Sequence, residues 1–437
     1  MAINKQTTQG QSYTLSPETA LGTAAVGGAK YFRPETFDLP TQTAQAFVPE
    51  SGGHINPANT NKAIPFKDGS GTGSISMLVR RATTTLEPSV GIMLKAGGWT
   101  QAKLTGATTV KTATEVDDLI FTADVAAENG SFVLVETTDD RFELVHIAAW
   151  TAAGTHGVPV FDMSADPTDL DAIEQAFTYY PQTGTLGATE GVTFVHQSRV
   201  TDGADVQEWT HGGCACILKT ITIEPNKPWM FEFEVLVANT ASADGTWVAE
   251  TDHEVVGVAM VNNDFEFLLE DANALGAGGI ARTSMGIRKV TIDTGVTAEK
   301  ITSVGGSTDL NSVGGYSIKT VPPTWTVDGW FDASRVADWQ TGFISGTGTN
   351  PDVALMASSA TQDQALYPAC AVSSPRCNLI ECPTTTLEGT DSGLVEMTLM
   401  FRANDAILAT ADARATLGNA TDAGNQAIYI GISGTGA

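Results

Sequence analysis

The sequence has few basic residues and no long apolar run. Its 437 residues include 23 Lys and Arg against 50 Asp and Glu, which gives a formal net charge of −27. No cluster of lysines and arginines is available to neutralise phosphates, which argues against tight nucleic-acid binding through counterion release. No apolar run approaches the roughly 18 residues that a membrane-spanning helix needs. Neither tight nucleic-acid binding nor a membrane-spanning helix is therefore expected.

Cysteine is also scarce. The five cysteines, at positions 214, 216, 370, 377 and 382, form an odd set, and the opening residues Met1–Gln6 lack the apolar core of a secretory signal. We therefore expect folding in a reducing cytoplasm rather than in a compartment that forms disulfides.

Catalytic motifs are absent from the sequence. It contains no G-x-S-x-G, P-loop, H-E-x-x-H or G-x-G-x-x-G pattern, and its six histidines are scattered along the chain. The sequence predicts neither an enzyme nor a cofactor. A pair of glycoside-cleaving carboxylates stays open as an alternative, because an acidic chain offers such pairs throughout.

Two clusters offer metal ligands without the usual spacing. Cys214, Cys216 and His211 carry soft ligands, and the acidic run from Asp162 to Glu174 carries oxygens. Neither a Cys-x-x-Cys pair nor an EF-hand loop pattern is present. Buried structural thiols and a solvated turn are the preferred interpretations, so no metal site is predicted.

Short runs of alternating apolar and polar residues, separated by Gly, Asn, Asp and Pro, predict a mainly β protein. The clearest strand is 229–238, in which Glu232 and Glu234 share one face and five apolar residues share the other: Trp229, Phe231, Phe233, Val235 and Val237. Further strands are predicted at 74–81, 191–196, 216–223, 255–261, 265–269, 287–292, 325–331 and 394–402.

A strand followed by a capped helix is predicted twice. After the strand at 74–81, Pro88 suits the first turn of a helix, and Gly97 is positioned to end it in a left-handed conformation. After the strand at 325–331, a second helix is predicted to end at Gly346. The spacing from Cys216 to Asn239 also resembles the spacing from Cys382 to Asn404. These similarities predict one β-rich module used twice.

The predicted organisation has four parts. Residues 1–30 are polar and are predicted to form an extended N-terminal arm, and residues 31–99 with 166–245 form the first module. Residues 246–437 form the second module. Between the two pieces of the first module, two apolar runs flank a short polar turn, which predicts a hairpin within a small inserted β unit at 100–165.

Four segments carry a resemblance to a known family: Pro17–Thr23, the strand 73–81 leading to Val90–Trp99, the turn Gly212–Cys214 leading to Ile217–Ile223, and Leu394–Asn404. In these segments and in their order, the chain resembles the major tail tube proteins of long, non-contractile-tailed (siphovirus-type) bacteriophages. The resemblance implies two β-sandwich or barrel modules, each with one flanking helix, plus the inserted unit.

The resemblance further implies a structural protein of the virion. Such proteins assemble in the host cytoplasm into stacked rings that form a tail tube, the conduit for DNA ejection. Two modules in one chain imply a homotrimeric ring with pseudo-hexameric symmetry, and a single module with insertions would imply a true hexamer. Tape-measure and tail-terminator proteins are the expected partners, DNA passes without specific binding, and no membrane is involved. Glu232, Glu234 and Glu396 are candidates for a lumen-facing acidic surface.

Two other functions remain open at this point. The first is a glycan-binding or adhesive β-sandwich protein on a cell or phage surface, which would carry an exposed aromatic patch. The second is a glycoside-active enzyme, which would lose hydrolysis when one carboxylate pair is changed.

Overall fold

The structure is a computed structural model of the whole chain. It describes residues 11–25, 28–40, 43–47, 64–68, 71–82, 87–103, 111–112, 119–121, 130–137, 141–150, 156–165, 173–174, 176–182, 184–186, 191–199, 206–247, 254–259, 265–271, 286–302, 313–332, 340–341, 353–361, 369–381, 394–404 and 426–433.

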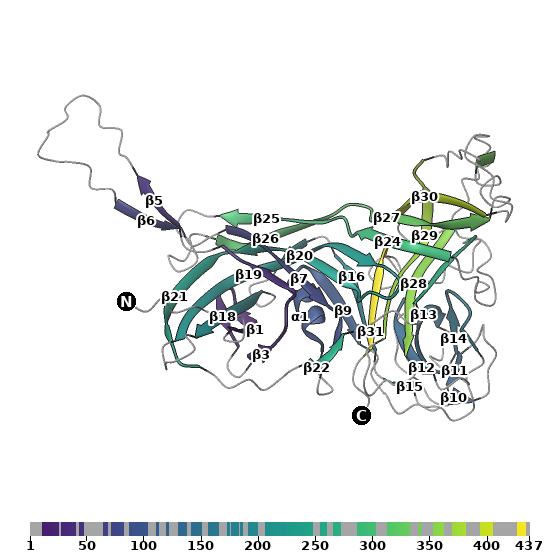
Figure 1. Ribbon diagram of the computed structural model, residues 1–437, viewed down its shortest axis with the longest axis horizontal. Coiled ribbons are helices and arrows are strands. Elements are labelled where there is room, and N and C mark those ends of the chain that lie inside the picture. Colours follow the sequence, from purple (N-terminus) through teal and green to yellow (C-terminus); the bar gives the residue numbers. More distant parts are fainter. Residues whose placement is uncertain are drawn as a thin grey trace, which may run out of the picture.

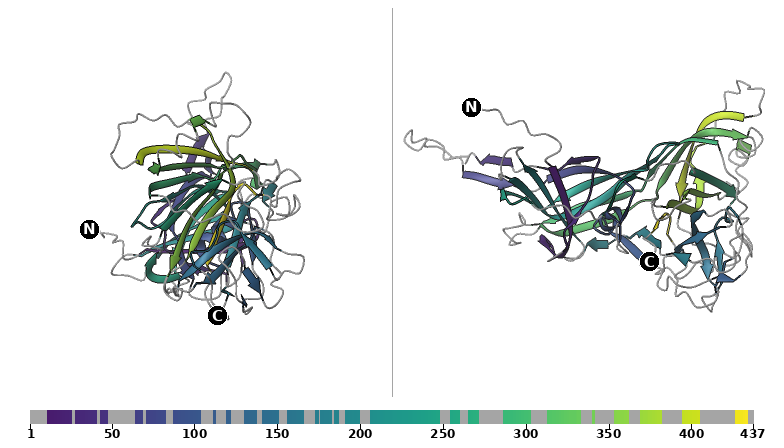
Figure 2. Two further views of the ribbon diagram at one scale, coloured as in Figure 1. Left: turned by 90° about the vertical axis from the view of Figure 1, so that its right-hand side faces the viewer. Right: turned by 60° about the horizontal axis from the view of Figure 1, so that its bottom comes forward.

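The described part of the chain is mainly β, as the alternating sequence patterns predict, and its sheets are antiparallel (Figure 1). Its one α-helix described from end to end is α1 (Ser89–Lys95). Gln340 and Thr341 also have helical backbone, and the remainder of the predicted second helix lies outside the described residues. Figure 2 shows that the strands curve rather than lie in one flat layer, and the larger of two clusters of buried hydrophobic residues includes residues of both halves of the chain.

Strands of the first half pair in the order β1–β18–β19–β20–β7–β4, with β21 also on β19. Their bounds are β1 Gln11–Ala20, β4 Thr36–Asp38, β7 Gly71–Leu78, β18 Val192–Arg199, β19 Val206–Ile223, β20 Met230–Val237 and β21 Asn239–Gly245. Smaller strands extend this half: β2 Thr23–Ala24, β3 Lys30–Tyr31, β8 Arg80–Ala82, β9 Trp99–Lys103, β16 Ala176–Pro181 and β17 Gly184–Leu186.

Strands of the second half pair in a corresponding order, β23–β28–β29–β30–β27–β24, with β31 also on β29. Their bounds are β23 Phe265–Asp271, β24 Gly286–Asp293, β27 Thr324–Asp332, β28 Val353–Thr361, β29 Cys370–Leu379, β30 Leu394–Ala403 and β31 Tyr429–Ser433. A further strand, β22 (Glu254–Ala259), pairs with β8.

The two sets also share a backbone irregularity. In the first, the register between β18 and β19 shifts after Val192↔Cys214, and in the second the register between β28 and β29 shifts after Val353↔Cys377. The thiol of each cysteine donates a hydrogen bond to the backbone carbonyl oxygen three residues earlier, Cys214 to His211 and Cys377 to Ser374. The structural counterpart of Cys214 is therefore Cys377, and the sequence comparison of Cys216 with Cys382 was wrong in register.

A hairpin occupies the same chain position in each set. The hairpin of β5 (Thr43–Phe47) and β6 (Ile64–Asp68) lies between β4 and β7, and the hairpin of β25 (Val296–Thr302) and β26 (Val313–Thr320) lies between β24 and β27. Thr43 pairs with Asp68, and Val296 pairs with Thr320. Ser74, which pairs with Asp38, matches Thr326, which pairs with Thr291. Thr43 and Val296 each lie five residues after Asp38 and Thr291, and Asp68 and Thr320 each lie six residues before Ser74 and Thr326, so the registers of the two hairpins correspond.

The predicted strand at 229–238 is confirmed as β20. Trp229, Phe231, Phe233, Val235 and Val237 are all buried in the main core, because alternate residues of a strand point to the same face. Burying side chains of this size contributes about 1.5–3 kcal/mol each before the entropy cost is subtracted.

Helix α1 is confirmed, with one correction to its end. It follows Pro88, which has extended backbone, and it packs against β9, β16 and β19. The left-handed residue is Gly98 (φ +84°) and not the predicted Gly97. Gly97 is needed for another reason, since a Cβ there would lie 1.9 Å from the carbonyl oxygen of Cys216.

The segment predicted as an arm contains β1, which pairs with β18 over its length and occupies the place that β23 has in the second half. Its Glu18 is buried, and its carboxylate accepts hydrogen bonds from the backbone N–H groups of Gly22 (2.8 Å) and Gly213 (2.8 Å) and from the hydroxyl of Thr193 (2.7 Å). These bonds attach the turn after β1 to the irregular point of β19.

The predicted hairpin of the inserted segment is confirmed as β12 (Phe132–Glu136) and β13 (Phe142–Trp150). The same region contains β10 Lys111–Thr112, β11 Leu119–Phe121, β14 His156–Pro159 and β15 Ile173–Glu174. β13 also pairs with β28, and His146 of β13 hydrogen-bonds to Ser373 of β29. This region therefore packs against the second half of the chain, although it is inserted in the first half.

Candidate functional surface

Successive pairings join the two halves into one continuous sheet. β19 pairs with β24 through Thr220↔Asp293 to Ile223↔Val290, so the sheet runs β4–β7–β20–β19–β24–β27–β30. One side of this sheet covers the core. The other side, which we term the open face, carries these described residues: Thr36, Asp38, Thr72, Ser74, Ser76, Thr220, Thr222, Met230, Glu232, Glu234, Lys289, Thr291, Asp293, Thr324, Thr326, Asp328, Trp330, Thr398, Met400 and Arg402.

The open face carries two of the three acidic residues that the sequence singled out. Glu232 is exposed and accepts a hydrogen bond from the hydroxyl of Thr220 (2.5 Å). Glu234 forms an ion pair with Lys219 (3.0 Å). Glu396 lies opposite Trp330 in the register of β27 and β30, and its side chain is outside the described part.

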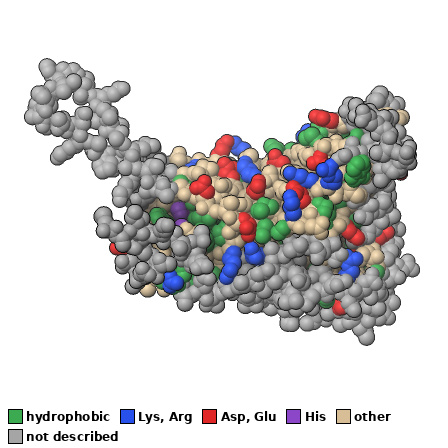
Figure 3. All heavy atoms as spheres, in the orientation of Figure 1, with side chains coloured by type: hydrophobic (Ala, Val, Ile, Leu, Met, Phe, Trp, Pro, Cys, Tyr) green, Lys and Arg blue, Asp and Glu red, His purple; other side chains and the backbone are tan. Residues whose placement is uncertain are grey.

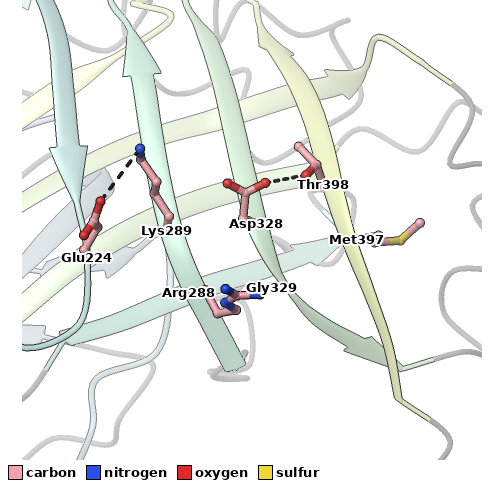
Figure 4. Close-up of a pocket in the computed structure, with 7 residues that line it drawn as sticks. All are labelled: Glu224, Arg288, Lys289, Asp328, Gly329, Met397 and Thr398. Atoms are coloured by element: carbon pink, nitrogen blue, oxygen red, sulfur yellow. Dashed lines mark hydrogen bonds and ion pairs between the residues drawn. The ribbon is translucent and has the colours of Figure 1, made fainter. Parts of the chain in front are cut away.

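A half-open groove lies on this face where β24, β27 and β30 run side by side (Figure 4). It is lined by Glu224, Arg288, Lys289, Asp328, Gly329, Met397 and Thr398. Lys289 forms an ion pair with Glu224 (3.7 Å), and the hydroxyl of Thr398 donates to Asp328. The groove therefore contains one pair of opposite charges, Lys289 and Glu224, and one carboxylate, Asp328, that is hydrogen-bonded to a hydroxyl.

Acidic and basic side chains are also interspersed on the side of the molecule shown in Figure 3. On the open face, short hydroxyl side chains separate these charges. Exposed pairs of this kind contribute about 0–1 kcal/mol each to stability. The open face has more acidic than basic side chains, and a sheet surface of threonines and excess negative charge does not attract an anionic polymer.

The structure does not assemble the soft metal ligands into a site. Cys214 and Cys216 are buried, and burial raises the pKa of both thiols well above the ordinary value. His211 is engaged by the hydroxyl of Thr240 (3.0 Å), and burial lowers its pKa to about 4. Among the described residues no group of three or more His, Cys, Asp or Glu side chains could hold a metal ion. Most of the acidic run after Asp162 lies outside those residues.

Aromatic rings form a ladder across β1, β18 and β19. His196 stacks on Tyr13 (centroids 4.8 Å apart) and on Trp209 (5.1 Å), and burial lowers the pKa of His196. Tyr13 also contacts Phe37 (4.8 Å). Because the ring faces cover one another, this ladder is a packing feature rather than an open platform for a sugar ring.

The sequence matches no protein-family model and no curated protein. Among the described residues, no helix has the length and apolarity required to cross a membrane.

Proposed function

We propose that this protein is a structural protein of the virion that polymerises into stacked rings and forms a phage tail tube. In this proposal each chain supplies two tube modules, and three chains close a ring of six. The bore of the stacked rings conducts DNA into the host, and the inserted segment lies on the outside. Tape-measure and tail-terminator proteins contact the tube during assembly.

The observation that carries the proposal is the junction between β19 and β24. It joins two sets of strands that have the same order of pairings. The last residues of β19 in the first set pair with β24 at the edge of the second set, so the contact uses different strands of the two sets. β4 is the counterpart of β24, and among the described strands it pairs with β7 alone. The same junction made between chains would place β4 of one copy beside the end of β29 of the next. A heterologous contact of this kind generates a closed ring when the rotation closes.

Ring closure would also satisfy the sheet edges. An exposed edge strand presents unpaired backbone donors and acceptors, which favour pairing with another chain, and a closed barrel has no edge. The open face would then line the bore. Its threonines and its net negative charge, with five acidic side chains against Lys289 and Arg402, support the passage of DNA without adhesion.

The test is negative-stain electron microscopy of the purified protein over a range of concentrations, with class averages of any rings. We expect hollow rings or short tubes with threefold symmetry and six similar units around the bore. Native mass spectrometry of the same samples should give three chains per ring, whereas six chains would show a true hexamer.

Monomers that persist at the highest concentration would contradict the proposal. A glycan array on the same sample would then test the alternative of a glycan-binding surface protein. Rings that fail to stack would support the proposed ring and contradict the proposed tube.

A further inference from the structure

The two corresponding hairpins have different surroundings. The hairpin β25–β26 lies across the first half of the chain, where β26 pairs with β17 and β25 contacts β19. The hairpin β5–β6 extends away from the body (Figures 1 and 2), although its backbone register is the same. One hairpin is therefore packed against its own chain, whereas its counterpart extends away from it.

Three contacts hold β25–β26 on the first half. The hydroxyl of Tyr316 donates to the backbone carbonyl oxygens of Gly213 and Leu236. The ammonium group of Lys300 donates to the carbonyl oxygen of Gly71 (3.0 Å). Beneath the hairpin, Ile217 of β19 has an exposed fraction of 0%.

The corresponding surface of the second half is uncovered. Because Cys377 is the counterpart of Cys214, the counterpart of Ile217 is Ile380, whose exposed fraction is 41%. The backbone N–H of Ile380 bonds to the carbonyl oxygen of Met400 (2.9 Å), so the residue is held beside β30 and not in a detached loop. The two equivalent places therefore differ in one respect: Ile217 is fully buried, whereas Ile380 is exposed to water.

We propose that this surface, formed by Arg376, Asn378, Ile380, Met400 and Arg402, is the docking site for the β5–β6 hairpin of a second copy of the chain. The inference deepens the proposed function, because it supplies a contact within the ring that adds to the edge pairing of β4. The precedent is intramolecular: β25–β26 already makes this contact on the first half.

The register identifies the hairpin residues that make the contact. Thr43↔Asp68 corresponds to Val296↔Thr320, so Ile64 corresponds to Tyr316 and Phe66 corresponds to Ile318. Tyr316 and Ile318 belong to the main core cluster. In the assembly, Ile64 and Phe66 take the equivalent places over β29 and β30 of the neighbouring copy.

A photo-crosslinking amino acid at position 64 tests this directly. Mixed isotopically light and heavy full-length chains distinguish crosslinks between copies from crosslinks within one. We expect peptides that join position 64 to residues 376–381 or 400–403 of a different copy. The matched control carries the crosslinker at position 67, which corresponds to the exposed Lys319 on the opposite face of the hairpin. This control should not give those peptides.

A second measurement uses Ile380→Asp, with Trp330→Asp as its control because Trp330 has a similar exposed fraction of 37% but lies beside Glu396, at the other end of β30 from Met400 and Arg402. By sedimentation, Ile380→Asp should weaken self-association at least tenfold, and the control should change it less than threefold. Tubes that form normally while position 64 crosslinks elsewhere would overturn this inference and leave the proposed function standing. Absence of any association between wild-type copies would overturn both.

Discussion

The buried His146 makes the stability of this protein depend on pH. Its Nε2 faces the carbonyl oxygen of Gly130 (3.1 Å) and its Nδ1 faces the hydroxyl of Ser373 (2.9 Å). A carbonyl oxygen only accepts hydrogen bonds, so Nε2 carries the proton and Nδ1 accepts from Ser373. The ring also stacks on Phe132 and contacts Tyr429. Burial lowers the pKa of His146 to about 3.

The direction of the effect follows from the two protonation equilibria. In the unfolded chain the histidine pKa is about 6.5, so below that pH the unfolded state binds a proton that the folded state excludes. The contribution of neutral His146 to folding is therefore complete above pH 6.5 and declines as the pH falls toward 3. At pH 5 the loss is about 1.5 pH units, or about 2 kcal/mol at 1.36 kcal/mol per unit.

The assay is urea unfolding of wild type and of His146→Gln at pH 7.5 and pH 5.0. Glutamine can donate and accept hydrogen bonds but does not titrate in this range, so the difference between the two proteins removes the contributions of the carboxylates. We expect the wild type to lose about 2 kcal/mol more than the variant between these pH values. Equal losses in the two proteins would refute the assignment of His146 as a neutral buried base.

Three further predictions concern the backbone junctions and the open face. Glu18→Ala leaves three donors without their acceptor and should lower the free energy of unfolding by about 2–5 kcal/mol in urea titrations, with Glu35→Ala as the exposed control. Gly97→Val should prevent α1 from docking on β19 and lower the thermal midpoint by several degrees, whereas the exposed Gly184, around which a Cβ meets nothing, should tolerate Ala. Thr222 and Thr291 face each other across β19 and β24, and the double variant Thr222→Arg, Thr291→Arg should bind DNA in a salt-sensitive way, at least tenfold tighter than wild type in filter retention. The control is Thr297→Arg, on strand β25 of the hairpin. Equal retention of DNA by the double variant and the control would contradict the role of the open face.

The fold could be predicted from the sequence wherever one face of a strand is strictly apolar. This condition holds for β20 and for the strand–helix unit of β7 and α1, and their positions are confirmed. It fails for β29 and β31, which are buried on both faces and contain Ser, Gly and Cys in place of an alternating pattern. It also fails for β1, whose polar residues Ser12, Ser16 and Glu18 are buried because hydrogen bonds from neighbouring strands satisfy them.

The open face was only partly predictable. Glu232 and Glu234 alternate with large apolar residues and are visible in the sequence, whereas Thr220 and Thr222 follow a register shift at Lys219 that reverses which residues face outward. The ion pairs add a second obstacle. Lys289 and Glu224 come from strand ends that are far apart in the chain, so only the pairing of β19 with β24 brings them together.

The sequence alignment of the two halves failed for a related reason, and that reason bears on assembly. What the halves share is an irregular register at Cys214 and Cys377 and equal hairpin spacings, which fix the backbone. What they do not share are the side chains of the two corresponding surfaces: Leu236, which is buried, corresponds to the exposed Arg402. If both surfaces were covered by equivalent hairpins in every state, the same apolar residue would serve at both. In the proposed docking, the surface around Ile380 stays in water until a second copy binds, and the charge of Arg402 within that surface would keep the free chain soluble.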